Sequence, residues 1–363
     1  MKNVLLSIPL HRTGGIASWG QKYYQLYHNP DIKLIAVDNA PNRSDKAGLL
    51  ERIASGLFAT RRVLISIKEQ CKKNKIDIIH TTTSGSIGAF RDYLIGRYSK
   101  NHGIKSILHC HYGNIPLVLK KRNFISWLIY KSINQYDQVW VLDRATASFL
   151  KNNRSVSADV KLTPNSIEVR PNLILKPKSY KNVGFIANLV PDKGLFELIL
   201  AVKKLQNDVV LHIVGGGSID VVKRMKEIIG NDMGNRIKWY GRLNNDEAIA
   251  FMDKIDILAL PTYMGAEAFP ISILEAMSLG KLVISTKRAA IPDILTALDG
   301  SPCGILVKER SVEDIANAID WCITNNSIAD SICIKAYEKV YHCYRTDIVY
   351  NSYLENYKEL LRK

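Results

Sequence analysis

Residues 255–285 read IDILALPTYMGAEAFPISILEAMSLGKLVIS, and this stretch decides the fold class. It opens with an apolar run at Ile255–Leu260, passes through a loop into a helical run at Ile271–Leu279, and ends in a second apolar run at Leu282–Ser285. Short apolar runs bounded by turn residues are typical of buried strands, and a helix between two of them is typical of a parallel sheet. The stretch therefore predicts one strand–helix–strand unit.

The same alternation of strands and helices continues toward the N-terminus. The further predicted strands are Val4–Ile8, Lys33–Val37, Ile76–His80, Lys105–His109, Gln138–Leu142, Asn182–Ile186, Val209–Val214 and Ile237–Tyr240. Between the fifth and sixth of these, Ser166–Lys181 shows neither period and contains two prolines, which predicts a linker. The sequence thus predicts an α/β protein with two doubly wound, Rossmann-like domains.

The chain length of 363 residues suits two domains. We expect residues 1–170 to form the first domain and 171–345 to form the second. Residues 346–363 are predicted to form a helix that packs back on the first domain. No apolar run approaches the roughly 20 residues of a membrane-spanning helix, and the six cysteines show no zinc-ligand spacing. Because Val4–Leu10 is predicted to be a strand rather than a signal peptide, we expect a cytoplasmic protein with reduced thiols.

The net charge of +16 is concentrated in the first half of the chain. Residues 1–171 contain 26 Lys and Arg against 11 Asp and Glu, whereas the rest contains 24 against 23. Such an excess predicts that the first half meets membrane phospholipid, a lipid diphosphate or nucleic acid, unless it is only a soluble basic surface. Two helical runs carry both cations and apolar residues, Ala47–Lys73 and Ile115–Asn134. The first places Leu57, Leu64 and Ile67 on one face, which is typical of a core-facing helix, and the second suits a membrane interface.

Glycine-rich turns follow several predicted strands, at Gly14–Gly15, Lys193–Gly194 and Gly215–Gly217. Such turns allow a backbone to approach phosphate at the carboxyl edge of a parallel sheet. Neither the full dinucleotide-binding fingerprint nor the Walker phosphate loop is present, which disfavours simple NAD-binding and P-loop ATP-binding proteins.

Two acidic residues, Glu267 and Glu275, flank the predicted start of a helix near Pro270. The free N–H groups at a helix start bind a diphosphate well, and a neighbouring carboxylate binds a sugar diol. The alternative is one capping acid and one solvated acid. His109 and His111 end another strand, and we expect His111, beyond the strand end, to be the functional one of the two.

The order of these motifs resembles the retaining glycosyltransferases of family 4, which have the GT-B architecture of two Rossmann-like domains facing across a cleft. The segments that carry the resemblance are Pro164–Glu168, Leu189–Gly194, Val214–Gly217, Tyr240–Arg242, Asp256–Thr262, Glu267–Glu275 and Ala290–Asp293. They follow one another in the family's order, and the resemblance runs through most of the chain, most strongly from Gly184 to Val307. It implies that residues 1–170 form an acceptor-binding domain and that residues 171–345 form a nucleotide-sugar-binding domain.

The resemblance implies catalytic roles for His111, Lys193 and Glu267. Lys193 would neutralise the donor diphosphate, Glu267 would contact the transferred sugar, and His111 would reach that sugar from the first domain. The implied donor-binding residues are Gly15, Asn188, Lys193, Gly216, Arg242, Glu267, Phe269, Pro270, Ile271 and Glu275. Among these, Glu275 would bind the ribose and the loop at Arg242 would border the base.

Two positions depart from the family pattern. Ala187-Asn188 stands where many relatives have Gly-Arg, and an uncharged Asn cannot replace a guanidinium in stabilising a leaving diphosphate. Arg12 and Arg242 are the candidates to compensate. Ala268 and Pro270 replace glycines often found in the paired-Glu motif.

The resulting prediction is a retaining hexosyltransferase that uses a nucleotide-sugar as its substrate, with a UDP-sugar favoured and GDP-mannose second. We expect a lipid-linked glycan acceptor in surface polysaccharide biosynthesis, such as O-antigen or capsule, and a peripheral position on an anionic membrane surface. Since no Asp-x-Asp triplet occurs, neither a metal nor another cofactor is expected. The alternatives are a catalytically inactive nucleotide-sugar-binding protein, another enzyme of the same architecture such as an epimerase or phosphorylase, and a nucleic-acid binder, which lacks a recognition module.

Overall fold

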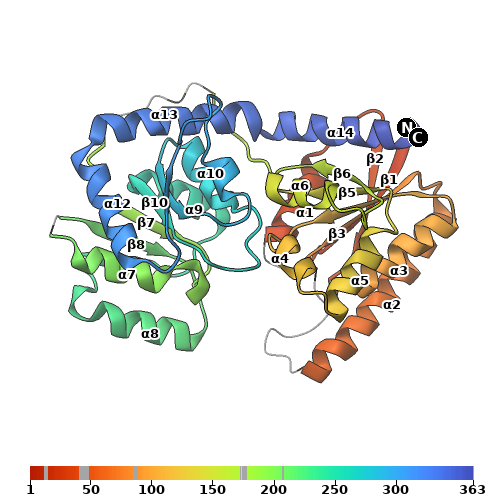
Figure 1. The fold of residues 1–363 in the computed structure, drawn as a ribbon, viewed down its shortest axis with the longest axis horizontal. Coiled ribbons are helices and arrows are strands. Elements are labelled where there is room, and N and C mark those ends of the chain that lie inside the picture. The colour runs from red at the N-terminus through yellow and green to blue at the C-terminus, as the bar shows by residue number, and fades with distance from the viewer. Residues whose placement is uncertain are drawn as a thin grey trace. The chain divides into compact units, whose positions relative to one another are not determined.

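The structure is a computed structural model of the chain and describes residues 1–11, 15–40, 49–85, 88–171, 173, 178–206 and 208–362 (Figure 1). Between residues 49 and 53 only the backbone is described. The chain divides into two compact units, which are described separately. Unit 1 comprises Met1–Asn165 and Tyr350–Lys363, and unit 2 comprises Ser166–Val349.

Unit 1 is built on a six-stranded parallel sheet with the order β2-β1-β3-β4-β5-β6. Its strands are β1 (Lys2–Ile8), β2 (Ile32–Asp38), β3 (Ile78–Thr83), β4 (Lys105–Cys110), β5 (Gln138–Val141) and β6 (Asp159–Leu162). Its helices are α1 (Gly15–Leu26), α2 (Leu49–Lys73), α3 (Gly88–Asn101), α4 (Ile115–Lys120), α5 (Phe124–Ile133), α6 (Arg144–Lys151) and most of α14 (Thr346–Arg362). The central strands are apolar throughout because both faces are covered, as in Val4–Leu6, where every residue is fully buried.

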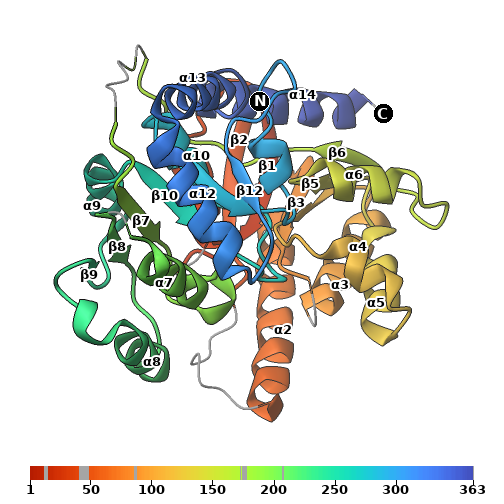
Figure 2. The ribbon, with the colours of Figure 1, turned by 60° about the vertical axis from the view of Figure 1, so that its left-hand side comes forward.

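Unit 2 repeats this design with the strand order β12-β11-β10-β7-β8-β9. Its strands are β7 (Asn182–Ile186), β8 (Val210–Val214), β9 (Ile237–Trp239), β10 (Ile257–Leu260), β11 (Leu282–Thr286) and β12 (Ile305–Val307). Its helices are α7 (Leu195–Lys204), α8 (Ile219–Ile229), α9 (Asn245–Phe251), α10 (Ile271–Ser278), α11 (Ile291–Ile294), α12 (Val312–Thr324) and α13 (Asn326–Cys343), with short 3-10 turns η1 (Pro191–Lys193), η2 (Gly230–Asp232) and η3 (Met252–Lys254). Figure 2 shows helices on both faces of this sheet. The predicted doubly wound α/β fold class is confirmed.

Three details differ from the prediction. The edge strands β6 and β12 were not expected, because a four-residue run of mixed polarity and an apolar run of three residues are too short to give a clear periodic signal. In α2, Leu57 is 55% exposed although it shares the predicted apolar face with Ile67, which is fully buried. The cause is length: Figure 1 shows the first half of α2 projecting beyond the rest of unit 1, so only its second half reaches the core.

In the Ile115–Asn134 segment, which was expected to suit a membrane interface, part of the apolar surface belongs to the core instead. Leu128 and Ile129 of α5 belong to a buried hydrophobic cluster that also includes residues of α3, β4 and β5. Phe124 and Trp127, on the same helix, are exposed. Within the residues that the structure describes, no helix has both the length and the hydropathy that crossing a bilayer requires.

Candidate active site

The turn that carries Lys193 is pressed against the end of the neighbouring strand β10. Gly194 closes this turn with a φ of 80°, and a Cβ on it would lie 2.3 Å from the carbonyl oxygen of Pro261. The amide of Tyr263 donates a hydrogen bond of 2.8 Å to the carbonyl of Asp192, which fixes the turn to the loop after β10. Only glycine fits there, so the chain holds the lysine at the carboxyl edge of the sheet.

Lys193 forms an ion pair with Glu267, which comes from the loop after β10. The Lys193 Nζ lies 3.1 Å from the Glu267 Oε2, and the two side chains are only 18% and 12% exposed. This contact lacks hydrogen-bond geometry, so the same buried oxygen has no hydrogen-bond donor among the described residues. A buried acceptor without a donor is costly, and a ligand hydroxyl would satisfy it.

Helix α10 follows the glutamate loop and begins without a side-chain cap. Pro270 occupies the N-cap position, and the Ile273 amide bonds back to the Pro270 carbonyl at 3.2 Å. Phe269 is buried edge-on against Tyr344, with ring centroids 5.5 Å apart. The uncapped first turn leaves backbone donors and the positive end of the helix dipole for an anion. Ile271 and Glu275 lie one helical turn apart, so Glu275 belongs to the same helix face.

The loops after β7, β8 and β9 are packed together through a glycine run. A Cβ on Gly215 would lie 1.9 Å from the Ala187 carbonyl oxygen, and one on Gly217 would lie 2.7 Å from the Leu189 carbonyl oxygen. A Cβ on Gly216 would lie 3.0 Å from the Nε of Arg242. Asn188, immediately before Leu189, is exposed.

Adjacent strands therefore bring most of the predicted donor-binding residues to one edge of the unit 2 sheet. Strands β10, β7, β8 and β9 are neighbours in the sheet and run parallel, so their carboxyl ends meet at the same edge. Their following loops carry Glu267, Lys193, Gly216 and Arg242 in turn. Edges of this kind are where doubly wound sheets bind ligands.

In unit 1, His111 lies just beyond the end of β4 in a buried aromatic environment. It is 9% exposed, and its ring centroid lies 4.1 Å from that of His109 and 4.6 Å from that of Trp19. Burial lowers the pKa of His111 to about 3, so the imidazole is neutral at physiological pH. Its Nε2 has no hydrogen-bond partner among the described residues, which leaves a neutral polar atom for a ligand hydroxyl.

Behind His111 runs a buried chain of hydrogen bonds that sequence reasoning missed. His80 Nδ1 lies 2.7 Å from the Tyr357 hydroxyl, and His80 Nε2 lies 3.3 Å from His109 Nδ1. The chain ends at Thr163 on one side, 3.4 Å from His109, and at Tyr23 on the other, 3.0 Å from Tyr357. The contact between His80 and His109 could have been predicted, since both residues end predicted strands of one sheet. The contact with Tyr357 could not, because its place depends on how α14 packs.

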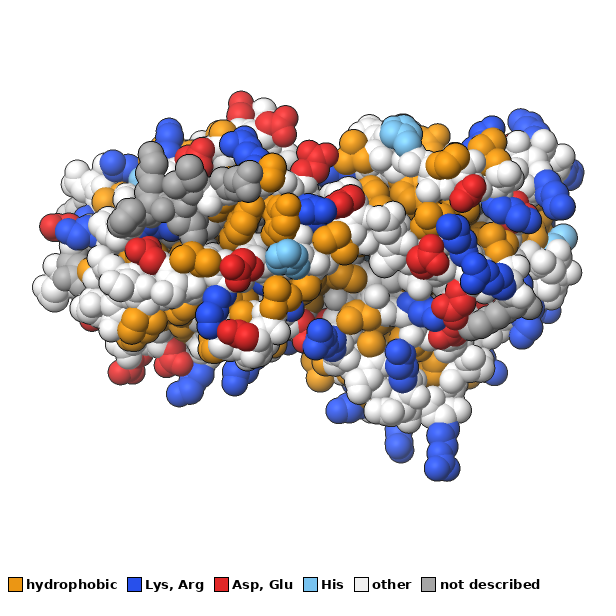
Figure 3. All heavy atoms as spheres, turned by 90° about the horizontal axis from the view of Figure 1, so that it is seen from above, with side chains coloured by type: hydrophobic (Ala, Val, Ile, Leu, Met, Phe, Trp, Pro, Cys, Tyr) orange, Lys and Arg blue, Asp and Glu red, His pale blue; other side chains and the backbone are white. Residues whose placement is uncertain are grey.

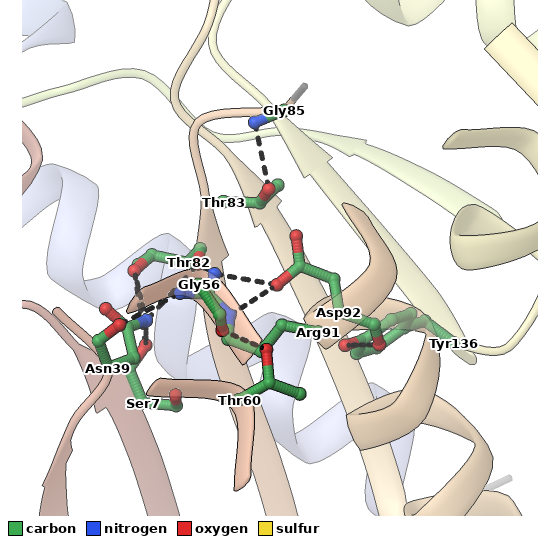
Figure 4. Close-up of polar contacts among 10 residues, drawn as sticks. All are labelled: Ser7, Asn39, Gly56, Thr60, Thr82, Thr83, Gly85, Arg91, Asp92 and Tyr136. Atoms are coloured by element: carbon green, nitrogen blue, oxygen red, sulfur yellow. Dashed lines mark hydrogen bonds and ion pairs between the residues drawn. The ribbon is translucent and has the colours of Figure 1, made fainter. Parts of the chain in front are cut away.

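A second buried polar cluster closes the carboxyl ends of β1 to β3 (Figure 4). Arg91 donates hydrogen bonds to the carbonyls of Asn39 at 3.0 Å and Thr82 at 3.1 Å, and to Asp92 Oδ1 at 2.7 Å. Asp92 is 1% exposed, and burial raises its pKa although Arg91 opposes that shift. In the sequence, a neighbouring Arg and Asp in a helix are typical of a solvated face, so this clamp was not expected.

Gly15 begins helix α1, and no atom lies within 4 Å of a Cβ built on it. Gly14 and Arg12 lie outside the described residues, so Arg12, a candidate to compensate for Asn188, cannot be placed. No group of three His, Cys, Asp or Glu side chains in the described part of the chain is arranged to hold a metal ion.

Residues 168–339, which include Lys193, the glycine run, Arg242 and both glutamates, match the family model described as glycosyl transferases group 1. This segment, which makes up most of unit 2, belongs to the family described as glycosyl transferases group 1. The predicted resemblance and its GT-B architecture are thereby confirmed.

Similar proteins agree with the glycosyl transferases group 1 assignment. An uncharacterised glycosyltransferase of Methanocaldococcus jannaschii is 26% identical over 62% of this chain and 60% of its own length. A putative colanic acid biosynthesis glycosyltransferase of Salmonella typhimurium is 27% identical over 43% of this chain and 39% of its own. The chain thus spans less than two thirds of either relative. The structure of Anabaena HepE in complex with UDP has the same fold, with a TM-score of 0.72 and 18% identity over 99% of this chain and all of HepE.

Proposed function

We propose that the protein is a retaining hexosyltransferase that moves a sugar from a nucleotide-sugar to a glycan acceptor. The observation that carries this proposal is the Lys193–Glu267 pair, which is partly buried at the carboxyl edge of the unit 2 sheet beside the uncapped start of α10. A diphosphate needs a cation and backbone donors, and a sugar needs a carboxylate acceptor, and this edge offers all three.

In this proposal the donor diphosphate lies at Lys193 and at the first turn of α10, near Phe269, Pro270 and Ile271. Glu267 accepts a hydrogen bond from a hydroxyl of the transferred sugar, through the Oε2 that has no donor of its own in the described residues. Glu275, one turn along α10, binds the ribose diol. The neutral imidazole of His111 in unit 1 is proposed to exchange a hydrogen bond with a sugar hydroxyl, and Gly15 to allow close approach of a phosphate to α1.

The chemical step follows from this placement. The bond between the anomeric carbon and the diphosphate oxygen breaks, and the new bond forms from the acceptor hydroxyl on the same face of the sugar. The departing diphosphate takes the acceptor's proton, while Lys193 and the α10 dipole stabilise the developing negative charge. This electrostatic role is metal-independent.

The donor is proposed to be a UDP-sugar first and GDP-mannose second. HepE, which shares the fold, has been solved with UDP. The acceptor is proposed to be a lipid-linked glycan of surface polysaccharide biosynthesis, consistent with the name of the Salmonella relative. A thermal-shift comparison of UDP, GDP and ADP separates the donor candidates, because only a bound nucleotide raises the melting temperature.

We also propose that unit 1 rests on the anionic inner face of the plasma membrane through helices α4 and α5. Phe124 and Trp127 are exposed by 69% and 54%, and their rings stack 5.7 Å apart. The basic run Lys120–Arg122 is exposed between the two helices. Figure 3 shows blue side chains outnumbering red ones on the visible face of unit 1. Exposed aromatics next to cations suit a lipid headgroup layer, where each cation contributes about 1 kcal/mol.

The main test of transfer is Lys193→Ala, assayed with nucleotide-sugars and a lipid-linked acceptor. Loss of this cation should reduce kcat by about 10²- to 10³-fold, with an unchanged melting temperature. Lys203→Ala is the matched control, since Lys203 also forms an ion pair, with Asp232 at 3.3 Å, but lies at the opposite end of helix α7 from Lys193. Turnover by Lys193→Ala at the wild-type rate contradicts the proposal.

Membrane contact is tested by sedimentation with vesicles that contain anionic phospholipid. Phe124→Ser with Trp127→Ser should reduce binding at least tenfold, whereas Leu26→Ser, which changes an exposed leucine of α1, should leave it intact. Wild-type binding should weaken at high salt. Binding that ignores lipid charge contradicts this part of the proposal.

A catalytically inactive nucleotide-sugar-binding protein is the alternative, favoured only by the uncharged Asn188. It predicts donor binding with neither transfer nor donor hydrolysis in a product assay.

A further inference from the structure

We propose that Arg242 binds the diphosphate of the nucleotide-sugar through its guanidinium, and that its side chain serves the phosphates rather than the base. This inference rests on the proposed function and assigns a charge role to one residue of the same site. It explains how a site with an uncharged Asn188 retains a second cation.

The charge balance of the site calls for such a group. Lys193 already faces Glu267 at 3.1 Å, so the pair brings no net charge to the site. A nucleotide diphosphate carries two negative charges as a sugar ester and a third after the sugar has left. Lys193 is already neutralised by Glu267, and the helix dipole is equivalent to only about half a positive charge. Together they do not balance the two or three negative charges of the diphosphate.

The other arginines near this edge of unit 2 are already engaged. Arg288 lies 2.7 Å from Glu309, and Arg310 stacks on the ring of Tyr263 at 4.4 Å. Arg242 is exposed and forms no ion pair with any residue that the structure describes. Arg288 and Arg310 follow β11 and β12, away from β8 and β9 in the strand order, so among the described residues Arg242 is the arginine beside the glycine run that no carboxylate neutralises.

Arg242 is held where an anion would meet backbone donors. Its Nε and Cβ would lie 3.0 and 3.3 Å from a Cβ on Gly216, so the absent side chain is what lets the arginine lie along the glycine run. The Gly215 amide donates to the Gly241 carbonyl at 2.7 Å, which fixes the loop that carries Arg242. A Cβ at position 216 would require the Arg242 side chain to shift by a few tenths of an ångström.

The glycine run adds donors of its own. Within the described part of the chain, the amides of Gly216 and Gly217 have no hydrogen-bond acceptor. Successive free amides beside a guanidinium form a concave anion site, and arginine binds phosphate with two parallel hydrogen bonds. A pyrimidine or purine ring offers no comparable negative charge.

Position 188 lies next to the same loop. The Leu189 amide donates a hydrogen bond of 2.9 Å to the Gly216 carbonyl. Asn188, which precedes Leu189 in the chain, therefore lies close to the glycine run. A guanidinium introduced at position 188 would therefore serve the same anion. This proximity makes a rescue experiment possible.

The experiment is calorimetric titration of the full chain with uridine, UMP and UDP, and with guanosine, GMP and GDP. Arg242→Gln should weaken binding of the diphosphate by 10- to 100-fold and binding of the nucleoside by less than threefold, since a charge-assisted phosphate contact contributes about 1.5–3 kcal/mol. The double variant Asn188→Arg with Arg242→Gln should regain at least tenfold in diphosphate affinity. Arg224→Gln, on the exposed surface of α8, is the matched control and should change nothing.

An equal loss for nucleoside, monophosphate and diphosphate would assign Arg242 to the base and overturn the inference. Unchanged diphosphate affinity in Arg242→Gln would overturn it as well, and so would a double variant no better than the single one. Arg242→Gln should melt at the wild-type temperature, because its side chain is exposed. If the wild-type chain binds none of the six compounds, the proposed function itself fails, which is a different result from normal wild-type binding without an Arg242 effect.

Discussion

Unit 1 and unit 2 share one architecture but place opposite kinds of groups at the carboxyl edges of their sheets. In unit 2 that edge carries an ion pair, Lys193–Glu267, with both side chains partly accessible. In unit 1 it carries imidazoles that burial keeps neutral, His109 and His111 among them. The comparison teaches that one fold can present charge for an anion in one place and uncharged hydrogen-bonding groups for hydroxyls in another.

The difference also lies in what the polar groups do for the fold. In unit 1 the Arg91–Asp92 pair, in which Asp92 is buried and Arg91 is 14% exposed, is structural, because Arg91 donates hydrogen bonds to backbone carbonyls at the strand ends. In unit 2 the pair at the site bonds no backbone, and the glycines around it hold the geometry. Four predictions test this contrast, from the largest expected effect to the smallest.

Arg91→Leu should destabilise the chain by about 3–5 kcal/mol, because the buried carboxyl of Asp92 and the backbone carbonyls of Asn39 and Thr82 all lose the hydrogen bonds that Arg91 donates. Chemical denaturation with urea measures this loss. Adding Asp92→Asn should recover part of it, since no charge is then left buried. If the double variant is less stable than the single one, the cluster does not act as a charge-compensated clamp.

Gly194→Ala should cost about 2–4 kcal/mol in unit 2, from a left-handed backbone and from the clash with the Pro261 carbonyl. Gly234→Ala is the control, because Gly234 also has a positive φ, of 85°, but has no atom within 4 Å of its Cβ position. It should cost only about 1–2 kcal/mol in the same urea titration. Equal losses in both variants would mean that the contact with β10 is unimportant.

The buried histidines should make unit 1 sensitive to acid. Burial lowers the pKa of His80 and of His111 to about 3, whereas an unfolded histidine titrates near 6.5. The unfolded chain therefore binds more protons, and stability is complete above pH 6.5 and falls as the pH drops from there toward 3. Each buried histidine contributes up to about 1.4 kcal/mol per pH unit in this window.

The measurement is the free energy of unfolding between pH 7 and 5 for His109→Gln and for His28→Gln, which changes an exposed histidine of unit 1. The first variant should show a shallower pH dependence than the wild type, and the second should match the wild type. Identical slopes for all three proteins would show that the buried imidazoles do not set the acid sensitivity.

Tyr357→Phe should have the smallest effect, about 1 kcal/mol, because it removes one hydroxyl that contacts both Tyr23 and His80. Tyr24→Phe, at a tyrosine of α1 that is 41% exposed, should be neutral. Thermal unfolding compares the two variants. A neutral Tyr357→Phe would mean that ring packing alone holds this part of α14.

The sequence predicted the central strands and helices of both units well, but it did not predict the short edge strands of their sheets. The strand–helix–strand stretch at residues 255–285 predicted a parallel sheet correctly, because strands buried on both faces appear in the sequence as continuous apolar runs. Short edge strands such as Ile305–Val307 escaped prediction because they depend on a neighbour for pairing rather than on their own periodicity. Leu57 was assigned to the core because a helical pattern does not reveal where the sheet beneath it ends.

The candidate site in unit 2 was predictable because its residues lie in one ordered set of turns. The surroundings of His111 were not, since Trp19 and His80 approach it from elements far away in the sequence. The role of Arg91 was missed for the same reason. Its acceptors are backbone carbonyls at the ends of other strands, and the residue types in the sequence do not indicate which carbonyls lie near Arg91.

The division of unit 1 into two chain segments has a consequence for biosynthesis. Tyr353 and Tyr357, which fill the space beside Trp140 and His80, are translated only after all of unit 2. While it is still attached to the ribosome, unit 1 therefore lacks part of its interior, whereas unit 2 already has its whole sequence. The first unit to emerge is the last to be completed, so a nascent chain that stalls before residue 350 exposes an open aromatic pocket to chaperones and proteases.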